Sequence, residues 1–421
     1  MEDKMEFQRK KYLDSLIARK HNGMIKIVTG IRRCGKSYLL FNIFYRHLIS
    51  IGVPEDHIIR IALDDLENES LCEYHALYNR IKSLISDSGM YYLLLDEIQF
   101  VPQFEKVLNS LLHISNIDTY VTGSNSKFLS SDIVTEFRGR GDEIRLHPIS
   151  FAEFAEAKEG SFDDLWNEYF RYGGLPQAVN ISQHEMKAEY LKNLFEKVYI
   201  SDVLEHHRIN NVSDFSEILD FLASSTGSYV TPTKLEKTFK TVKHSTISHT
   251  TISQYIEYLK DAFLISKAQR YDIKGKKYIN ANCKYYFEDL GLRNARLDFR
   301  QTEENHLMEN IIYNELLFRG YNVDIGIVEN FERNEKKEVV RKQFEVDFVA
   351  NSGDKRCYIQ SAFSMFDEQK REQEKKSLKN IPDSFKKIII VRENTIPGYD
   401  ENGFFIMGLK DFLTNPASLD F

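Results

Sequence analysis

Residues 30–37 read GIRRCGKS, and this stretch decides the fold. It satisfies the pattern G-x-x-x-x-G-K-[ST], in which the glycines let the backbone wrap a phosphate and the lysine reaches the β- and γ-phosphates. An apolar run over 24–29 predicts a strand before the loop, and a helical pattern from Lys36 to about Ile49 follows it. A strand, a glycine-rich loop and a helix N-terminus in this order predict a phosphate-binding loop.

The loop predicts both a nucleotide site and part of a metal site. ATP is the expected nucleotide, and the Ser37 hydroxyl is expected to ligate Mg²⁺. The predicted nucleotide-binding residues are Gly30, Arg33, Cys34, Gly35, Lys36, Ser37 and Tyr38.

A second apolar run, YYLLLDE at 91–97, ends in two carboxylates. Asp96 is predicted to share the Mg²⁺ shell with Ser37, and Glu97 to polarise the attacking water. The alternative is a strand that ends in solvated acids, which the phosphate loop disfavours. The sequence thus predicts ATP and Mg²⁺ as cofactors and Glu97 as a catalytic residue.

Two polar features follow later in the chain. TGSN at 122–125 comes after a predicted strand, so Ser124 or Asn125 is expected between the water and the γ-phosphate. Arg138 and Arg140 precede another predicted strand, and an arginine there can reach the γ-phosphate of a neighbouring protomer in a homo-oligomer. Arg140 is the preferred candidate, and a surface turn is the alternative interpretation of both arginines.

Predicted strands alternate with helical patterns over the first 150 residues, which predicts an α/β fold with a mostly parallel sheet covered on both faces. With the motifs above, the sequence resembles the additional-strand, catalytic-glutamate class of P-loop ATPases in the AAA superfamily. The resemblance implies a sheet order of 5-1-4-3-2. The predicted strands lie at 24–29, 58–63, 91–95, 118–122 and 143–146.

Further motifs narrow the resemblance to a prokaryotic ATPase family whose members join an AAA-type domain to a C-terminal domain of unknown function. They are DEIQ at 96–99, TGS at 122–124, GR at 139–140, PISFAEF at 148–154 and YGGLP at 172–176.

A basic segment lies inside an acidic chain. Residues 226–285 carry 11 Lys or Arg and 4 acids, whereas the whole chain carries a formal net charge of −7. Three helical patterns and two β-rich runs over 211–300 suggest a winged helix. The predicted DNA contacts are Thr250 and Gln254 on the third helix and Lys274, Lys276 and Lys277 on the wing tip. A winged helix that docks a protein partner is the alternative.

The last third resembles restriction-nuclease-like folds in the order of its polar residues. Glu309 lies on a predicted helix, Asp347 on a predicted strand, and Gln360 on the next strand. Gln360 stands where a glutamate ligand is usual, and Ala362 stands where a lysine is usual. A degenerate, structural or binding domain is therefore predicted, and a live nuclease whose lysine has moved elsewhere is the alternative.

These features predict four parts and one principal function. The parts are an AAA-type P-loop ATPase domain over 1–150, a helical linker or lid over 151–210, a winged-helix region over 211–300 and a nuclease-like domain over 301–421. The predicted function is a Mg²⁺-dependent ATPase that moves a DNA-binding arm. The alternatives are a nucleotide-gated switch that docks protein partners and an ATP-gated nuclease.

Composition sets outer limits on the class of protein. A hydrophobic content of 42% excludes a wholly disordered chain. The sequence has no run of 18 apolar residues, and its charged N-terminus predicts no secretory signal. Four scattered cysteines favour a reducing cytoplasm over a disulfide framework or a zinc site.

Overall fold

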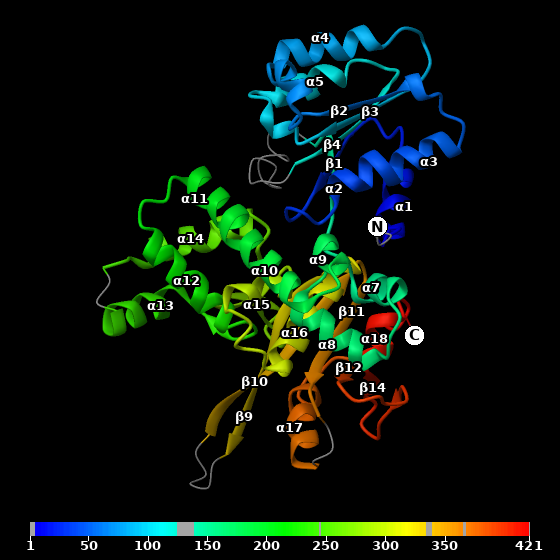
Figure 1. Cartoon of the computed structure of the whole chain (residues 1–421). Helices are drawn as coiled ribbons and strands as arrows, with labels where there is room; N and C mark the ends of the chain where they lie inside the picture. The colour runs from blue at the N-terminus through cyan, green and yellow to red at the C-terminus, as the bar shows by residue number, and fades with distance from the viewer. Residues whose placement is uncertain (1–4, 124–138, 244–245, 334–338, 365–367, 421) are drawn as a thin grey trace. The chain divides into compact units, whose positions relative to one another are not determined.

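The computed structural model describes residues 5–123, 139–243, 246–333, 339–364 and 368–420. The chain forms two compact units, whose elements are drawn in Figure 1. Unit 1 comprises Met1–Ile149 with Leu175–Gln177 and Asp261–Phe263, and unit 2 comprises the remaining segments from Ser150 to Phe421. Within the described residues, no helix combines the length and the hydrophobicity that crossing a bilayer requires.

Unit 1 is built on a five-stranded parallel sheet. Its strand order is β2-β3-β4-β1-β5, which confirms the order 5-1-4-3-2 implied by the resemblance. β3 is buried along its whole length, as its unbroken apolar sequence requires of a strand covered on both faces. The strands are β1 (Ile25–Thr29), β2 (Ile58–Ala62), β3 (Tyr91–Asp96), β4 (Ile117–Thr122) and β5 (Gly141–Arg145).

Helices cover both faces of this sheet (Figure 1). α4 (Tyr74–Leu84) and α5 (Phe104–Leu111) bury their apolar residues against β1–β4 on one face. The other face carries α1 (Lys10–Ala18), α2 (Lys36–Tyr38) and α3 (Tyr45–Ser50). The helix expected from Lys36 to Ile49 is interrupted by a π-helical segment at Leu39–Phe44. Short 3₁₀ turns lie at Glu55–His57, Leu66–Cys72 and Ile98–Phe100.

Unit 2 begins with a series of helices. Ser150 starts the first with a capping box to Glu153, and Thr231 caps a later one that has Pro232 in its first turn, as its sequence predicted. The helices up to residue 261 are α7 (Phe151–Ala157), α8 (Phe162–Tyr172), α9 (Pro176–Asn180), α10 (His184–Leu194), α11 (Ser201–His207), α12 (Val212–Ser224), α13 (Pro232–Thr238) and α14 (His249–Asp261), with π-helical segments at Phe195–Ile200 and Phe239–Lys243.

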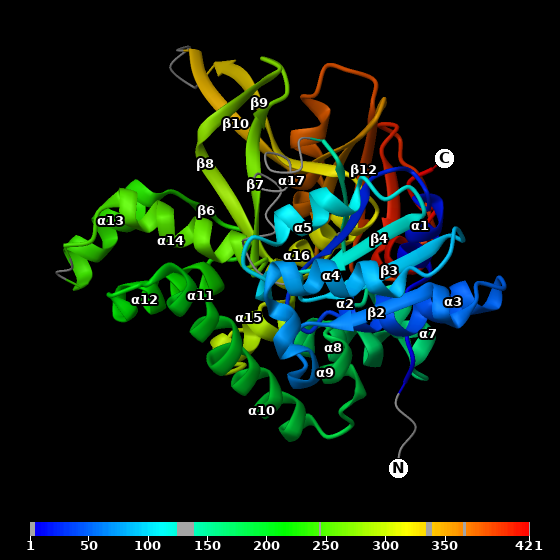
Figure 2. The ribbon, with the colours of Figure 1, turned by 90° about the horizontal axis from the view of Figure 1, so that it is seen from above.

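A nine-stranded mixed sheet forms the rest of unit 2, in the order β13-β14-β12-β11-β10-β9-β7-β8-β6. The predicted wing hairpin, β7 and β8, lies beside the long hairpin of β9 and β10 (Figure 2). The strands are β6 (Tyr229–Val230), β7 (Ile265–Asp272), β8 (Lys277–Phe287), β9 (Asn322–Arg333), β10 (Val339–Ser352), β11 (Lys355–Ala362), β12 (Lys386–Val391), β13 (Gly398–Tyr399) and β14 (Phe405–Gly408).

The expected boundary at residue 300 crosses this continuous sheet. Residues 270–272 of β7 pair in parallel with 325–327 of β9, so the predicted wing hairpin is part of the larger sheet. The edge of β7 that faces away from β8 is paired with β9, so β7 does not have the unpaired backbone groups of an exposed edge strand.

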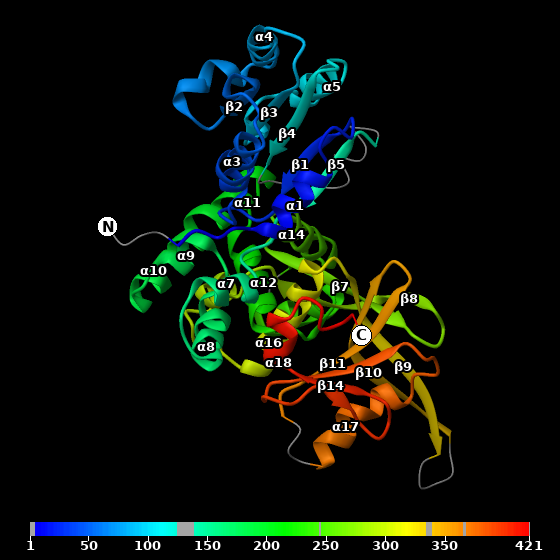
Figure 3. The same cartoon turned by 90° about the vertical axis from the view of Figure 1, so that its right-hand side faces the viewer.

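Helices lie on both faces of this sheet as well (Figure 3). On α16 (Glu304–Phe318), Tyr313 contacts Phe348, whereas α17 (Glu368–Lys379) places Leu378 against the cluster that contains Val349. Because Phe348 and Val349 are successive residues of β10, the two helices cover opposite faces. The remaining helices are α15 (Leu290–Arg296) and α18 (Leu409–Thr414).

A buried carboxylate, Asp289, joins the YGGLP motif to α15. It accepts hydrogen bonds from the backbone N–H groups of Gly174 at 2.7 Å and Leu292 at 3.0 Å. A Cβ at Gly173 would lie 2.3 Å from its Oδ1, so only glycine fits there. Burial raises the pKa of Asp289 to about 6, although these N–H groups oppose the shift.

Asp289 is expected to make stability depend on pH. Its folded pKa lies above the ordinary value of 3.8, so its contribution is full below that value and is lost as the pH rises through about 6. The free energy of unfolding of the wild type minus that of Asp289→Asn should fall by up to ~3 kcal/mol between pH 4 and 7. Denaturant titrations at both pH values measure it, with the exposed Asp354→Asn as control. An unchanged difference would contradict the assignment.

Candidate nucleotide-binding site

The loop after β1 has the backbone that phosphate binding needs. Gly30 and Gly35 have φ values of 137° and 102°, which side chains disfavour. A Cβ at Gly30 would lie 2.1 Å from the carbonyl oxygen of Leu146, so the loop is packed directly against the end of β5. Cys34 is buried in the same contact, with its sulfhydryl donating to that oxygen at 3.5 Å. Arg33 and Tyr38 are exposed.

Lys36 points back into the loop. Its Nζ donates hydrogen bonds to the carbonyl oxygens of Gly30 at 3.0 Å and Ile31 at 3.2 Å, and the residue is only 4% exposed. The ammonium is therefore held beside the loop N–H groups, where a bound phosphate would replace carbonyl oxygens as its partner.

Asp96, at the end of β3, meets residues from two other parts of the unit. The Thr122 hydroxyl donates to Asp96 Oδ1 and accepts the N–H of Glu97 at 3.0 Å. Burial raises the pKa of Asp96 above its ordinary value, while hydrogen bonds from Thr122 and Ser37 oppose the shift. Ser37 and Asp96, the two expected Mg²⁺ ligands, are thus brought together.

Glu97 follows directly and is held in a special position. Its φ of 51° is left-handed, which turns the chain sharply after the strand. The side-chain amide of Gln99 donates to Glu97 Oε2. Glu97 is partly exposed and follows Asp96 directly. Its carboxylate is oriented by Gln99, a residue to which the sequence interpretation gave no role.

Arg140 lies at the far edge of the sheet from the loop. Its carbonyl accepts the N–H of Ile25 at 2.9 Å, which places it at the start of β1, whereas Gly30 follows the end of β1. Five residues of strand separate them, roughly 16 Å. The exposed Arg140 side chain therefore lies away from the phosphate loop of its own chain. Ser124, Asn125 and Arg138 lie outside the described residues.

Part of the YGGLP motif belongs to the same unit as the loop. Leu175 is fully buried, and Pro176 Cγ lies 3.8 Å from the point that a Cβ on Gly35 would occupy. This motif therefore contributes apolar surface beside the phosphate loop, which the linear distance of about 140 residues concealed.

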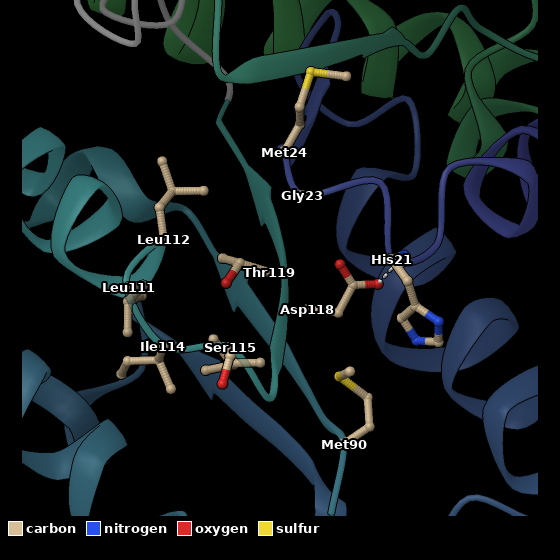
Figure 4. A pocket seen from close by; sticks show the side chains of 11 residues that line it. His21, Gly23, Met24, Met90, Leu111, Leu112, Ile114, Ser115, Asp118 and Thr119 are labelled. Atoms are coloured by element: carbon tan, nitrogen blue, oxygen red, sulfur yellow. Dashed lines mark hydrogen bonds between the residues drawn. The ribbon is translucent and has the colours of Figure 1, made fainter.

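A cavity of about 180 Å³ lies at the end of the sheet where β1, β3 and β4 begin, away from the phosphate loop, and is drawn in Figure 4. Asp118, on its wall, accepts hydrogen bonds from the His21 N–H at 3.1 Å, from the Tyr120 hydroxyl at 2.8 Å and from Lys26 Nζ. Its oxygens are thus committed to internal donors, which ties the starts of β1 and β4 together. None of the residues that line this cavity belongs to the phosphate loop.

The predicted DNA-contacting residues are exposed. Thr250 and Gln254 lie on the outer face of α14, while Ile252, Tyr255, Ile256 and Leu259 are buried on the other, as their spacing predicted. Lys276 and Lys277 are exposed at the β7–β8 turn. Lys274 is also exposed, and its ammonium donates to the carbonyl oxygen of Glu329 on β9 at 2.7 Å.

The predicted nuclease-like residues lie in unit 2 with partners of their own. Asp347 Oδ2 accepts the N–H of Ser361 at 2.8 Å, and burial together with the charge of Glu309 raises the pKa of Asp347 well above its ordinary value. Gln360 contacts α17, donating to Glu374 Oε2 at 3.1 Å and accepting from Ser377 at 3.3 Å. Glu309 bonds to Lys284, a residue that the interpretation of this domain did not include.

Family models match two parts of the chain. One described as an AAA domain matches residues 22–155, and one described as a domain of unknown function, DUF8612, matches residues 163–303. A Haemophilus influenzae protein is 33% identical over 92% of this chain and 94% of its own length. A Methanocaldococcus jannaschii protein is 30% identical over 85% of this chain and 79% of its own.

The chain therefore belongs to a prokaryotic family of P-loop ATPases of the AAA superfamily, which combine an AAA domain with a C-terminal domain of unknown function. Two solved structures are more distantly similar. Aeropyrum pernix ORC1 in complex with DNA has a TM-score of 0.34 at 13% identity, covering 72% of this chain and 94% of that one. AMPPCP-bound DnaA from Aquifex aeolicus has a TM-score of 0.32 at 12% identity, covering 60% and 87%.

Proposed function

We propose that this protein is a Mg²⁺-dependent ATPase that couples hydrolysis to DNA binding by the winged-helix region at residues 211–300, whose hairpin is part of the unit 2 sheet. The observation that supports this most directly is the convergence of Ser37, Asp96 and Glu97 beside a phosphate loop, where the Thr122 hydroxyl joins the Asp96 carboxylate to the backbone N–H of Glu97. A hydroxyl, a buried carboxylate and a partly exposed carboxylate are the groups that phosphoryl transfer to water requires.

Each residue has a distinct role in this proposal. The loop N–H groups and Lys36 would bind the phosphates, and Ser37 and Asp96 would hold Mg²⁺, which would neutralise charge on the β- and γ-oxygens. Glu97 would accept the proton of the attacking water, and Asn125 would orient that water.

Lys36→Ala is expected to weaken ATP binding on the order of 10²-fold, because the ammonium is the charged partner of the β- and γ-phosphates. Titration with a fluorescent ATP analogue measures the change. Lys82→Ala, an exposed lysine on α4, is the matched control and should bind like the wild type. Equal affinity in Lys36→Ala would place the nucleotide elsewhere.

The charge of residues 226–285 supports the DNA-binding part of the proposal. This segment has an excess of 7 positive charges in an acidic chain, and Thr250, Gln254, Lys276 and Lys277 are exposed on it. Contacts between such lysines and DNA phosphates make the affinity for DNA depend strongly on salt concentration.

Replacing Lys274, Lys276 and Lys277 with glutamate is expected to weaken binding to all duplex sequences alike. The slope of log K against log salt should become shallower by about 0.9 for every DNA phosphate that the variant no longer binds. Gel-shift titrations at several salt concentrations measure it. A triple variant with the same charge change at exposed sites, Lys10, Lys82 and Lys410 to glutamate, is the control. No binding by the wild type at low salt would favour protein docking instead.

The contact between Gln99 and Glu97 favours a second candidate, a nucleotide-gated switch with little turnover. An amide that occupies one oxygen of the proposed base competes with water for it. If this candidate holds, Gln99→Ala should raise the hydrolysis rate; in the ATPase proposed above, the rate should stay equal or fall.

A further inference from the structure

A lysine lies at the centre of the acidic cluster in unit 2. Lys284, on β8, is 4% exposed, and its Nζ lies 2.9 Å from Glu309 Oε1 and 2.6 Å from Glu345 Oε1. The buried Asp347 is close enough to interact electrostatically with the same ammonium. A single internal cation therefore faces three carboxyl groups from α16 and β10.

Two further donors of the protein reach this cluster. The Tyr286 hydroxyl donates to Glu309 Oε1 at 2.6 Å, and the Ser361 N–H donates to Asp347 Oδ2 at 2.8 Å. A divalent cation needs several of these oxygens at once, since Mg²⁺ and Mn²⁺ prefer about six oxygen ligands. In the described residues, with the Lys284 ammonium lying between these acids, no group of three or more metal-ligating side chains is arranged to hold a metal ion.

The backbone holds Lys284 in this position. Lys284 pairs with Ala268 of β7 on one side and with Tyr229 of β6 on the other, so it lies in an interior strand of the sheet. The Cα of Lys284 is thereby fixed, and turning the ammonium away would leave the carboxyl groups without their counter-charge, which is strongly unfavourable.

We propose that Lys284 takes the place of a divalent metal ion in this nuclease-like domain, so that its ammonium is the positive charge that the carboxyl groups of Glu309, Glu345 and Asp347 share. The lysine that the sequence pattern leads one to expect at Ala362 is thus supplied by β8, but as a counter-ion rather than as a helper to a metal-bound water. The proposal concerns unit 2 and stands independently of ATP hydrolysis.

The test is Mn²⁺ binding by the full-length chain without nucleotide, measured by electron paramagnetic resonance. The wild type and Asp347→Asn should bind the same amount of Mn²⁺. Lys284→Met keeps most of the length of the side chain without its charge, so the carboxylates can close on the space that the ammonium leaves and the variant should gain one Mn²⁺ per chain. Lys284→Met combined with Asp347→Asn should not bind that ion. Lys410→Met, an exposed lysine on α18, should bind like the wild type.

Two results would overturn the proposal. One is a Mn²⁺ ion in the wild type that Asp347→Asn removes, because the site would then accept a metal with Lys284 in place. The other is a folded Lys284→Met variant that gains no Mn²⁺. If that variant does not fold, the comparison of the wild type with Asp347→Asn still decides, since equal binding supports the proposal and unequal binding refutes it.

The same proposal predicts that the pure protein leaves supercoiled plasmid intact in Mg²⁺ or Mn²⁺, because no metal ion is held in this domain to activate water. Agarose gels measure this, with Asp347→Ala as the matched variant. Cleavage by the wild type that disappears in Asp347→Ala would show a working nuclease and contradict the neutralised site.

Discussion

Glu97→Gln is expected to bind ATP as tightly as the wild type and to hydrolyse it roughly 10²- to 10⁴-fold more slowly. The amide keeps the size and the left-handed turn of the residue, and it can still contact Gln99. It cannot accept a proton from water, so only the chemical step should be impaired. Phosphate release under single-turnover conditions measures the rate, and equilibrium titration measures the affinity.

A matched substitution separates this effect from a general loss of charge. Glu67→Gln changes an exposed glutamate of the same unit and should hydrolyse ATP like the wild type. Hydrolysis by Glu97→Gln at the wild-type rate would mean that another group activates the water.

Arg140→Ala is expected to cut the hydrolysis rate on the order of 10³-fold while ATP affinity stays within a few-fold. The side chain lies just before β5, at the strand edge away from its own phosphate loop. We therefore expect it to act on the nucleotide of a neighbouring protomer, where it would stabilise charge that develops in the transition state.

Such action between protomers makes activity depend on protein concentration. Specific activity of the wild type should rise with concentration, and mixing Arg140→Ala with Glu97→Gln should restore part of the activity, since one protomer then supplies the base and the other the arginine. Arg80→Ala, exposed on α4, is the control. A concentration-independent rate in a chain that stays monomeric with ATP would contradict this role.

The sequence predicted the unit 1 sheet because its signals are local. Each buried strand, such as Tyr91–Asp96, is a short apolar run. The loop after β1 matches G-x-x-x-x-G-K-[ST], a pattern typical of the phosphate-binding loop of P-loop folds. The strand order came from the family resemblance rather than from periodicity. The π-helical interruption at Leu39–Phe44 has no such signal, because its residues fit an ordinary helix equally well.

Long-range pairing was harder to predict. The β7–β8 hairpin was expected as the wing of a winged helix, and its pairing with β9, which lies about 50 residues further along the chain, was not foreseen. The TGSN motif was used only to assign roles to Ser124 and Asn125, and Thr122 received none. A hydroxyl at the end of the strand beside Asp96 could have indicated a contact with that carboxylate. Lys284 could not be placed because its partners lie on α16 and β10.

The central claim is that nucleotide hydrolysis is coupled to duplex DNA, and steady-state ATPase activity with and without DNA tests it most directly. Mg²⁺ and ATP are kept saturating, and Glu97→Gln serves as the blank. The account predicts a measurable basal rate that rises when duplex DNA is added and that does not rise in the glutamate variant of Lys274, Lys276 and Lys277. A rate indistinguishable from that of Glu97→Gln, unchanged by DNA, would contradict it.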